Sequence, residues 1–283
     1  GIAAQSVGVS QAAYNEALSY AKDRKQFDTA IIRFPAVYDM LSRMKAKLDA
    51  GRSILYQTAR YVDIYKALDD IARERKLTAE ERQEQKKYAR LADAFTPLAK
   101  GMNSEYANQN AYDAIQVHGG SGFIMEYKCQ RLYRDARIFS IYEGTTQLQV
   151  VAAIRYITNG TYMGMIKDML ERDVADSMKA LKVRVALMAE KLEDAVNAVK
   201  EAGSQELQDF VARRLYEMTA DTIMSLLILD DATRSPQLFE KSANVYVRYA
   251  EAEVNAHHSF IKSLRAEDLE YYRQAEKEAE TEE

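Results

Sequence analysis

The feature that most constrains the fold of this chain is its scarcity of residues that interrupt helices. Its 283 residues include only 11 glycines and 3 prolines, and Pro35 and Pro97 lie far apart with long uninterrupted stretches around them. An all-β or α/β chain of this length needs more turn residues than this. The sequence therefore predicts an all-α protein, with a four-helix-bundle-type domain followed by a second helical bundle.

Apolar residues recur at helical spacing in the first part of the chain. We expect a first helix over about 3–23 and a second from Pro35, because proline suits the first helical turn. The second helix has an apolar seam with alternating steps of four and three, formed by Val37, Leu41, Met44, Leu48, Gly51 and Leu55. A glycine in this seam predicts a close crossing with another helix.

Capping and stop signals delimit the later helices. Thr78 followed by Glu81 is a capping-box pattern, so a third helix is expected to begin there and to end at Gly119-Gly120. Five more helices are expected, over about 128–137, 145–158, 178–203, 205–229 and 236–264.

The character of the sequence changes slightly after the Asn159-Gly160 stop, where a new seam begins at Met178. We place a boundary near residue 160, which gives a helical domain over 1–160 and an additional C-terminal helical domain over 161–283. The acidic end, residues 273–283, is expected to be a fraying helix end or a disordered tail.

Charge and composition argue against several classes of function. The net charge of −4 and pI near 5.7 give no reason to expect a nucleic-acid partner. No apolar run reaches the roughly 20 residues that span a bilayer. The single cysteine, Cys129, fits a reducing compartment, and we expect a cytoplasmic protein. The three histidines show no metal-ligand spacing, and His257-His258 is interpreted as a surface pair, so no metal site is expected.

One acidic residue, Glu143, lies in a Glu-Gly-Thr turn directly before an apolar, helix-like run. A carboxylate in a dry pocket gains basicity and can remove the weakly acidic proton next to a thioester. Ile141, Tyr142 and Leu148 are candidates for keeping it dry, and Gly144 would admit a ligand close to the backbone. The alternative, which the pattern alone favours, is an acid near a helix N-terminus that the helix dipole stabilises.

Two further segments carry weaker signals. The glycines of Gln116-Val-His-Gly-Gly120 expose amide groups that can approach a pyrophosphate, although a helix C-cap is the ordinary interpretation. Arg24-Lys-Gln-Phe27 offers a cation for phosphate and a ring for packing, although basic residues also end helices. His118 is interpreted as a loop residue without a catalytic role.

Together these segments resemble the acyl-CoA dehydrogenase family. Residues 141–147 of this chain read Ile-Tyr-Glu-Gly-Thr-Thr-Gln, and the family has a similar segment. The resemblance implies that Glu143 is the catalytic base and that Gly144 and Arg155 lie near the substrate. For Arg155, a surface helix arginine is an equal alternative. Pro35 stands where the family often has a flavin-contacting glutamine. The implied FAD contacts are Arg24, Gln26, Phe27, Gln116, Gly119, Gly120, Thr145 and Gln147, with Thr146 a weaker candidate.

The resemblance covers about residues 1–160, and residues 161–283 resemble the C-terminal helical extension of some larger family members. It implies an FAD-dependent enzyme that converts acyl-CoA thioesters to trans-2-enoyl-CoA. It also implies an electron-transfer flavoprotein as electron acceptor and a homodimer or homotetramer. Family enzymes have an N-terminal helical domain and a middle β-domain before this region. Because the chain begins at Gly1, we interpret it as a fragment that does not catalyse alone. The alternatives are a non-catalytic helical oligomerisation or scaffold module, and an acyl-CoA oxidase.

Overall fold

The computed structural model describes residues 1–273, so the expected acidic end lies almost wholly outside the described residues. The described chain is almost entirely helical, which confirms the all-α fold. The α-helices are α1 (Ile2–Asp23), α2 (Pro35–Glu74), α3 (Ala79–His118), α4 (Cys129–Ala136), α5 (Thr146–Thr158), α6 (Thr161–Leu170), α7 (Lys179–Ala202), α8 (Gln205–Arg234) and α9 (Pro236–Ser263). The short elements are β1 (Lys25–Gln26), β2 (Thr29–Ala30), η1 (Ile31–Arg33), η2 (Gly119–Gly122), η3 (Arg137–Ser140), η4 (Asp176–Met178) and η5 (Ala266–Tyr272).

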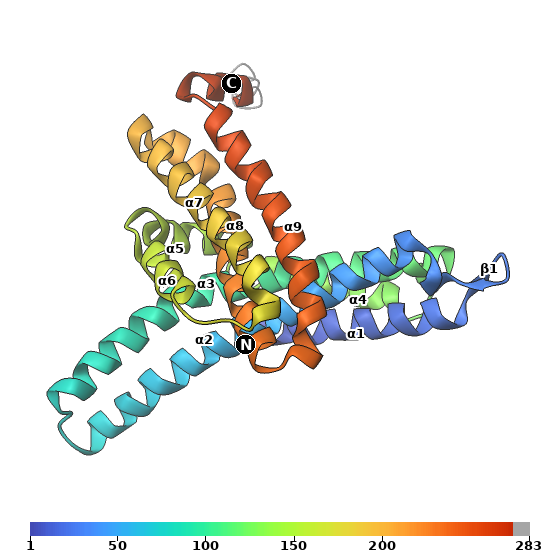
Figure 1. Cartoon of the computed structure of the whole chain (residues 1–283), viewed down its shortest axis with the longest axis horizontal. Helices are drawn as coiled ribbons and strands as arrows, with labels where there is room; N and C mark the ends of the chain where they lie inside the picture. Colours follow the sequence, from blue (N-terminus) through green and yellow to red (C-terminus); the bar gives the residue numbers. More distant parts are fainter. Residues whose placement is uncertain (274–283) are drawn as a thin grey trace, which may run out of the picture.

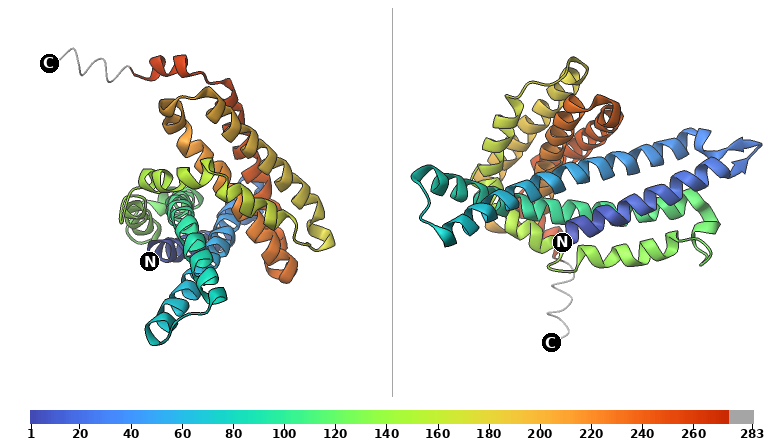
Figure 2. Two further views of the ribbon diagram at one scale, coloured as in Figure 1. Left: turned by 90° about the vertical axis from the view of Figure 1, so that its left-hand side faces the viewer. Right: turned by 90° about the horizontal axis from the view of Figure 1, so that it is seen from below.

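The two 40-residue helices, α2 and α3, form the axis of the molecule (Figure 1). Each is about 60 Å long at 1.5 Å per residue. At one end they lie beside α1 and α4, and at the other they project as a two-helix hairpin. The helices from α5 to α9 form a second group that crosses the middle of this axis, as the views in Figure 2 also show.

The buried apolar residues form two clusters. The smaller cluster joins α1, α2, α3 and α4 and is rich in alanine, including Ala13, Ala17 and Ala21 of α1. Such small residues let helices approach closely. The larger cluster joins α5 to α9 with the central parts of α2 and α3, so it draws residues from both sides of residue 160. The domain boundary near that residue stays a prediction.

The seam of α2 is confirmed, since Leu41, Met44, Leu48 and Gly51 are all buried. A Cβ added at Gly51 would lie 2.2 Å from Oδ1 of Asn103 on α3. The glycine therefore marks the close helix crossing that the seam predicts.

Most helix ends follow their sequence signals. The capping box is present, with Thr78 Oγ1 accepting from the Glu81 amide and the Glu81 carboxylate accepting from the Thr78 amide. Gly160 and Gly203 take positive φ angles of 80° and 63° just after helices. Three features differ from expectation: the β1–β2 hairpin, helix α6, and the extension of α8 to Arg234.

Two tyrosines from the second helix group bond to α3 around its internal proline. Pro97 lacks an N–H and weakens the local helix ladder. Tyr162 of α6 donates to the Ala94 carbonyl over 2.5 Å, and Tyr216 of α8 donates to the Pro97 carbonyl over 2.9 Å. Both rings are fully buried, so the second helix group packs tightly against α3 around Pro97.

We expect Gly101→Ala to destabilise the chain by about 1–3 kcal/mol, because a Cβ there would lie 2.1 Å from Oη of the buried Tyr216. Gly8→Ala is the matched control: no atom lies within 4 Å of its added Cβ, and alanine favours the α1 helix by about 0.5–1 kcal/mol. Urea unfolding of both variants measures the difference. Equal stability of the two would show that the contact at Gly101 is not tight.

Candidate active-site turn

The turn between η3 and α5 carries Glu143 in an unusual backbone conformation. Glu143 has a φ angle of 51° and Gly144 one of 92°. A residue other than glycine rarely adopts a positive φ angle, and such residues cluster at functional sites. Thr145 caps α5, since its Oγ1 accepts from the Leu148 amide over 3.3 Å. Glu143 therefore lies before the cap, in the turn itself, and the first turn of α5 contains no acid.

Lys100 of α3 bonds to the backbone of the turn. The lysine is buried, and its Nζ donates to the Gly144 carbonyl oxygen over 2.5 Å. Burial lowers the pKa of Lys100, and the nearby carboxylates of Glu105 and Glu143 oppose that shift. Lys100 was not among the residues predicted from the sequence. Its signal is a lysine placed among apolar residues on a long helix.

The two threonines at the start of α5 differ in exposure, since Thr145 faces solvent and Thr146 faces the core. Thr146 is buried, and its Oγ1 donates to Oε1 of Glu105 on α3 over 2.6 Å. Thr145 and Gln147, on either side of it, are exposed. Thr146 therefore anchors the helix, while the two residues predicted as FAD contacts are open to a ligand.

The predicted dryness around Glu143 is not supplied by its neighbours. Ile141, Tyr142 and Leu148 are 47%, 49% and 56% exposed, and Glu143 is exposed as well. Half-exposed side chains cannot exclude water from the carboxylate. A dry pocket requires a further surface against this turn.

The Arg24–Phe27 segment runs from the end of α1 along β1 to the tip of the β1–β2 hairpin. Phe27 and Asp28 have φ angles of 49° and 59°, so the two-residue turn is of the type that suits a hairpin. Phe27 is 90% exposed, and Arg24 and Gln26 are exposed too. The tip therefore offers a cation and a bare aromatic ring.

The Gly119-Gly120 turn lies at the same end of the molecule as the hairpin. Tyr20, near the end of α1, donates to Ser121 Oγ over 3.3 Å and stacks on His118 with a ring separation of 4.2 Å. No atom lies within 4 Å of a Cβ added at either glycine. The two glycines and Gln116 are exposed, so this backbone is accessible.

These two segments are far from the Glu143 turn within one chain. Lys100, which contacts the turn, is separated from His118 by about 27 Å along α3 at 1.5 Å per residue. Figure 1 shows the hairpin at one extremity and α5 near the middle of the molecule. A single copy therefore does not bring both groups to one place.

The structure corrects the interpretation of His118. The residue is the last of α3 rather than part of a loop, and it is buried. Its Nδ1 lies 2.7 Å from the Ala114 carbonyl oxygen, and its ring packs on Tyr20. The stacking partner comes from α1, so the local sequence gives no sign of it.

The other predicted site residue, Arg155, lies about 13 Å along α5 from Thr146. Its guanidinium is mostly exposed and donates to Asp93 over 2.8 Å. This placement agrees with the alternative of a surface helix arginine.

The two adjacent histidines are half-buried and bond to different acids. His257 Nε2 lies 3.1 Å from Glu217, and His258 Nε2 lies 2.7 Å from Asp194. No cluster of three His, Cys, Asp or Glu side chains suited to a metal occurs within residues 1–273. Over the same range, none of the helices has the length and apolar character needed to cross a bilayer.

The long helical axis, the crossing second group and the acid-bearing turn define a C-terminal region of the acyl-CoA dehydrogenase class. The family described as "Acyl-CoA dehydrogenase, C-terminal domain" matches residues 1–157, and "Acyl-CoA dehydrogenase C terminal" matches residues 158–269. The chain belongs to the acyl-CoA dehydrogenase family.

Individual relatives match parts of the chain. The caffeyl-CoA reductase-Etf complex subunit CarC of Acetobacterium woodii is 40% identical over 149 residues, which are 53% of this chain and 33% of that protein. An acyl-CoA dehydrogenase of Bacillus subtilis is 31% identical over 161 residues, 57% of this chain and 36% of that protein. The chain thus spans about a third of the length of the curated relatives it matches.

A solved structure extends the likeness across both helix groups. The acyl-CoA dehydrogenase of Bacillus anthracis, complexed with FAD, aligns with a TM-score of 0.71 at 22% identity. The alignment covers 92% of this chain and 47% of that one. This likeness concerns the fold alone.

Proposed function

We propose that this chain is the C-terminal part of an FAD-dependent acyl-CoA dehydrogenase in which Glu143 is the catalytic base. The observation that carries the proposal is the Glu143 turn, with its positive φ angles and its anchorage by Lys100, in a chain of this family. The half-exposed apolar side chains around Glu143 suit a surface that the rest of the protein covers. Covering them would exclude water and strengthen the base.

The proposed reaction removes two hydrogens from the acyl chain. The Glu143 carboxylate takes the α-proton of the thioester, and a bound FAD supplies the acceptor for the β-hydride. The product is the trans-2-enoyl-CoA. Gly144 lets the thioester approach the backbone, and Lys100 keeps the Gly144 carbonyl and the turn in place. Arg155, which pairs with Asp93 at the surface of α5, would lie near the substrate entrance.

The residues at the hairpin end fit the diphosphate of FAD. Gly119 and Gly120 have open space at their Cα atoms, and the side chain of Arg24 is exposed. Arg24, Gln26, Phe27 and Gln116 would then hold the cofactor together with these glycines. Pro35 supplies no amide side chain to it.

Thr145 and Gln147 would contact the cofactor at the other site, beside Glu143. Because about 27 Å of α3 separates the two groups in one chain, we propose that two copies share each cofactor. The protein would then be a homodimer or a homotetramer. The buried single cysteine agrees with a cytoplasmic location.

The electron acceptor is proposed to be an electron-transfer flavoprotein. The relative from Acetobacterium woodii is named as a subunit of a reductase-Etf complex, which supports that partner. The same name supports a second candidate function, reduction of an enoyl-CoA. In that direction Glu143 would donate the α-proton that it removes in the forward direction.

Anaerobic addition of acyl-CoA thioesters of different chain lengths to the full-length protein tests the proposal. We expect bleaching of the bound flavin by at least one of them, and no turnover by this chain alone. Peroxide formation in air would favour an oxidase, and steady-state reduction of enoyl-CoA faster than oxidation of acyl-CoA would favour a reductase. Absence of bound flavin would favour a helical scaffold.

A further inference from the structure

The second helix group lies directly behind the Glu143 turn. Tyr216 of α8 packs against Gly101 of α3. A Cβ added at Gly101 would also lie 3.5 Å from Cβ of Gln149 on α5. The same glutamine lies beside Gly144, because a Cβ added at Gly144 would lie 3.1 Å from Nε2 of Gln149. The turn therefore rests on α3 and α5, which rest on α8.

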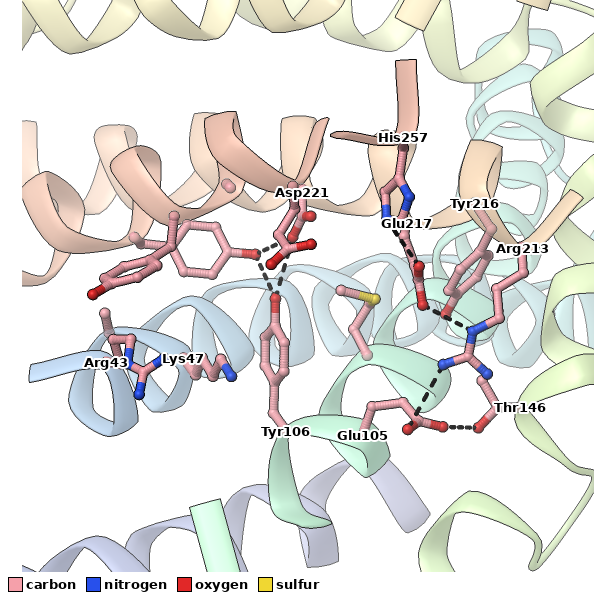
Figure 3. A pocket seen from close by; sticks show the side chains of 16 residues that line it. Arg43, Lys47, Glu105, Tyr106, Thr146, Arg213, Tyr216, Glu217, Asp221 and His257 are labelled. Atoms are coloured by element: carbon pink, nitrogen blue, oxygen red, sulfur yellow. Dashed lines mark hydrogen bonds and ion pairs between the residues drawn. The ribbon is translucent and has the colours of Figure 1, made fainter. Parts of the chain in front are cut away.

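A polar chain makes a second connection from α9 to the start of α5 (Figure 3). Thr146 donates to Oε1 of Glu105, and Oε2 of Glu105 lies 3.7 Å from an Nη atom of Arg213 on α8. Arg213 Nε also donates to Glu217 over 2.8 Å, and Glu217 accepts from His257 of α9 at 3.1 Å. These groups line a cavity of about 260 Å³ between α2, α3, α8 and α9.

We propose that the second helix group is a platform that positions the Glu143 turn, and that Arg213 is its positioning residue. Arg213 fixes the Glu105 carboxylate, Glu105 fixes Thr146, and Thr146 fixes the first turn of α5, directly after Glu143 and Gly144. The catalytic consequence rests on the role proposed for Glu143. The positioning itself does not.

The exposure of the ion pair separates positioning from stability. The side chains of Arg213 and Glu105 are 43% and 36% exposed, and pairs of this kind add little to folding. Loss of the Arg213–Glu105 pair therefore costs little folding free energy, and Glu217, the other partner of Arg213, keeps its contact with His257 in an Arg213 variant. Catalysis is more sensitive, because small displacements of a reacting group lower rates strongly.

Amide hydrogen exchange on this chain tests the positioning without any catalytic assay. In Arg213→Met, we expect exchange of the Tyr142, Leu148 and Gln149 amides to accelerate about three- to tenfold. Arg184→Met is the matched control, because it removes another partly exposed Arg–Glu pair of the second helix group, to Glu251, that does not touch the turn. It is expected to leave these amides unchanged.

Two further variants make the test specific to the proposed chain of contacts. Glu105→Gln keeps an acceptor for Thr146 but removes the charge that Arg213 faces, and it is expected to accelerate the same amides. Arg213→Lys keeps a cation and is expected to restore part of the protection. Unchanged exchange in both Arg213→Met and Glu105→Gln, or equal acceleration in Arg184→Met, would overturn the proposal.

Kinetics of the full-length protein give the functional arm. We expect Arg213→Met to lower kcat about three- to tenfold with little change in KM, and Arg184→Met to leave both unchanged. Thr146→Val combined with Arg213→Met is expected to be no slower than the slower single variant, because both act through Glu105. If exchange responds as expected while Glu143→Gln stays active, the positioning stands and the catalytic role of Glu143 fails.

Discussion

Replacing Glu143 with glutamine in the full-length protein is expected to slow flavin reduction by acyl-CoA by about 10²- to 10⁴-fold. Glutamine has nearly the same shape but cannot accept the α-proton. Both side chains face the same backbone requirement at φ 51°, and the anchors of the turn, Lys100 and Thr145, are untouched. The protein should therefore fold and keep its flavin. Anaerobic stopped-flow measurement of flavin bleaching gives the rate.

Two variants bracket this result. Glu143→Asp keeps a carboxylate but withdraws it by one methylene, so an intermediate loss is expected. Glu171→Gln alters an exposed acid at the end of α6, outside the turn, and should leave the rate unchanged. A Glu143→Gln protein that bleaches at the wild-type rate would assign the base to another residue.

The helices of this chain could largely be predicted because their signals are local. Pro35 begins α2, the Thr78–Glu81 box begins α3, and Gly203 ends α7, each within a few residues of the element it controls. Helix α6 was missed because Asn159-Gly160 indicates a stop. The chain resumes a helix at once, since Oδ1 of Asn159 accepts from the Thr161 amide over 3.0 Å.

The supports of the turn could not be predicted in this way. Lys100, Glu105 and Arg213 are distant from the turn in the sequence. Lys100 contacts Gly144, Glu105 contacts Thr146 and Arg213 contacts Glu105 only because α3, α5 and α8 cross. Periodicity identifies which face of a helix is buried, but not which residue of another helix it meets. The acid, its turn and the close crossing at Gly51 could be predicted because their signals lie in neighbouring residues and in the seam of one helix.

The second large effect is expected from Asp221, a buried acid of α8. Its Oδ1 accepts from the hydroxyls of Tyr246 over 3.0 Å and Tyr106 over 3.3 Å. Burial raises the pKa of Asp221 to about 7, and the Glu217 charge also raises it, while the two tyrosine bonds and His257 lower it. The neighbouring Lys47 of α2 is itself desolvated by burial, which lowers its pKa.

This shift makes the free energy of unfolding depend on pH. The folded state holds a proton on Asp221 between about pH 4 and pH 7, whereas the unfolded state releases it near pH 4. The stabilisation is complete below pH 4 and is lost as the pH rises to 7, by about 1.4 kcal/mol per pH unit and about 4 kcal/mol in total. The contribution of Asp221 to the free energy of unfolding should therefore fall from pH 5 to pH 8.

Asp221→Asn is expected to remove this dependence. The amide keeps an oxygen for the two tyrosine hydroxyls but does not ionise, so the variant should gain on the wild type from pH 5 to pH 8 and exceed its stability at pH 8. Urea unfolding at intervals across this range measures the difference. Asp209→Asn, an exposed acid on the same helix, should change the free energy of unfolding by less than about 0.5 kcal/mol at either pH. If the Asp221→Asn and wild-type curves run parallel, Asp221 is ionised in the folded state throughout this range, and the tyrosine hydrogen bonds and His257 outweigh the effect of burial.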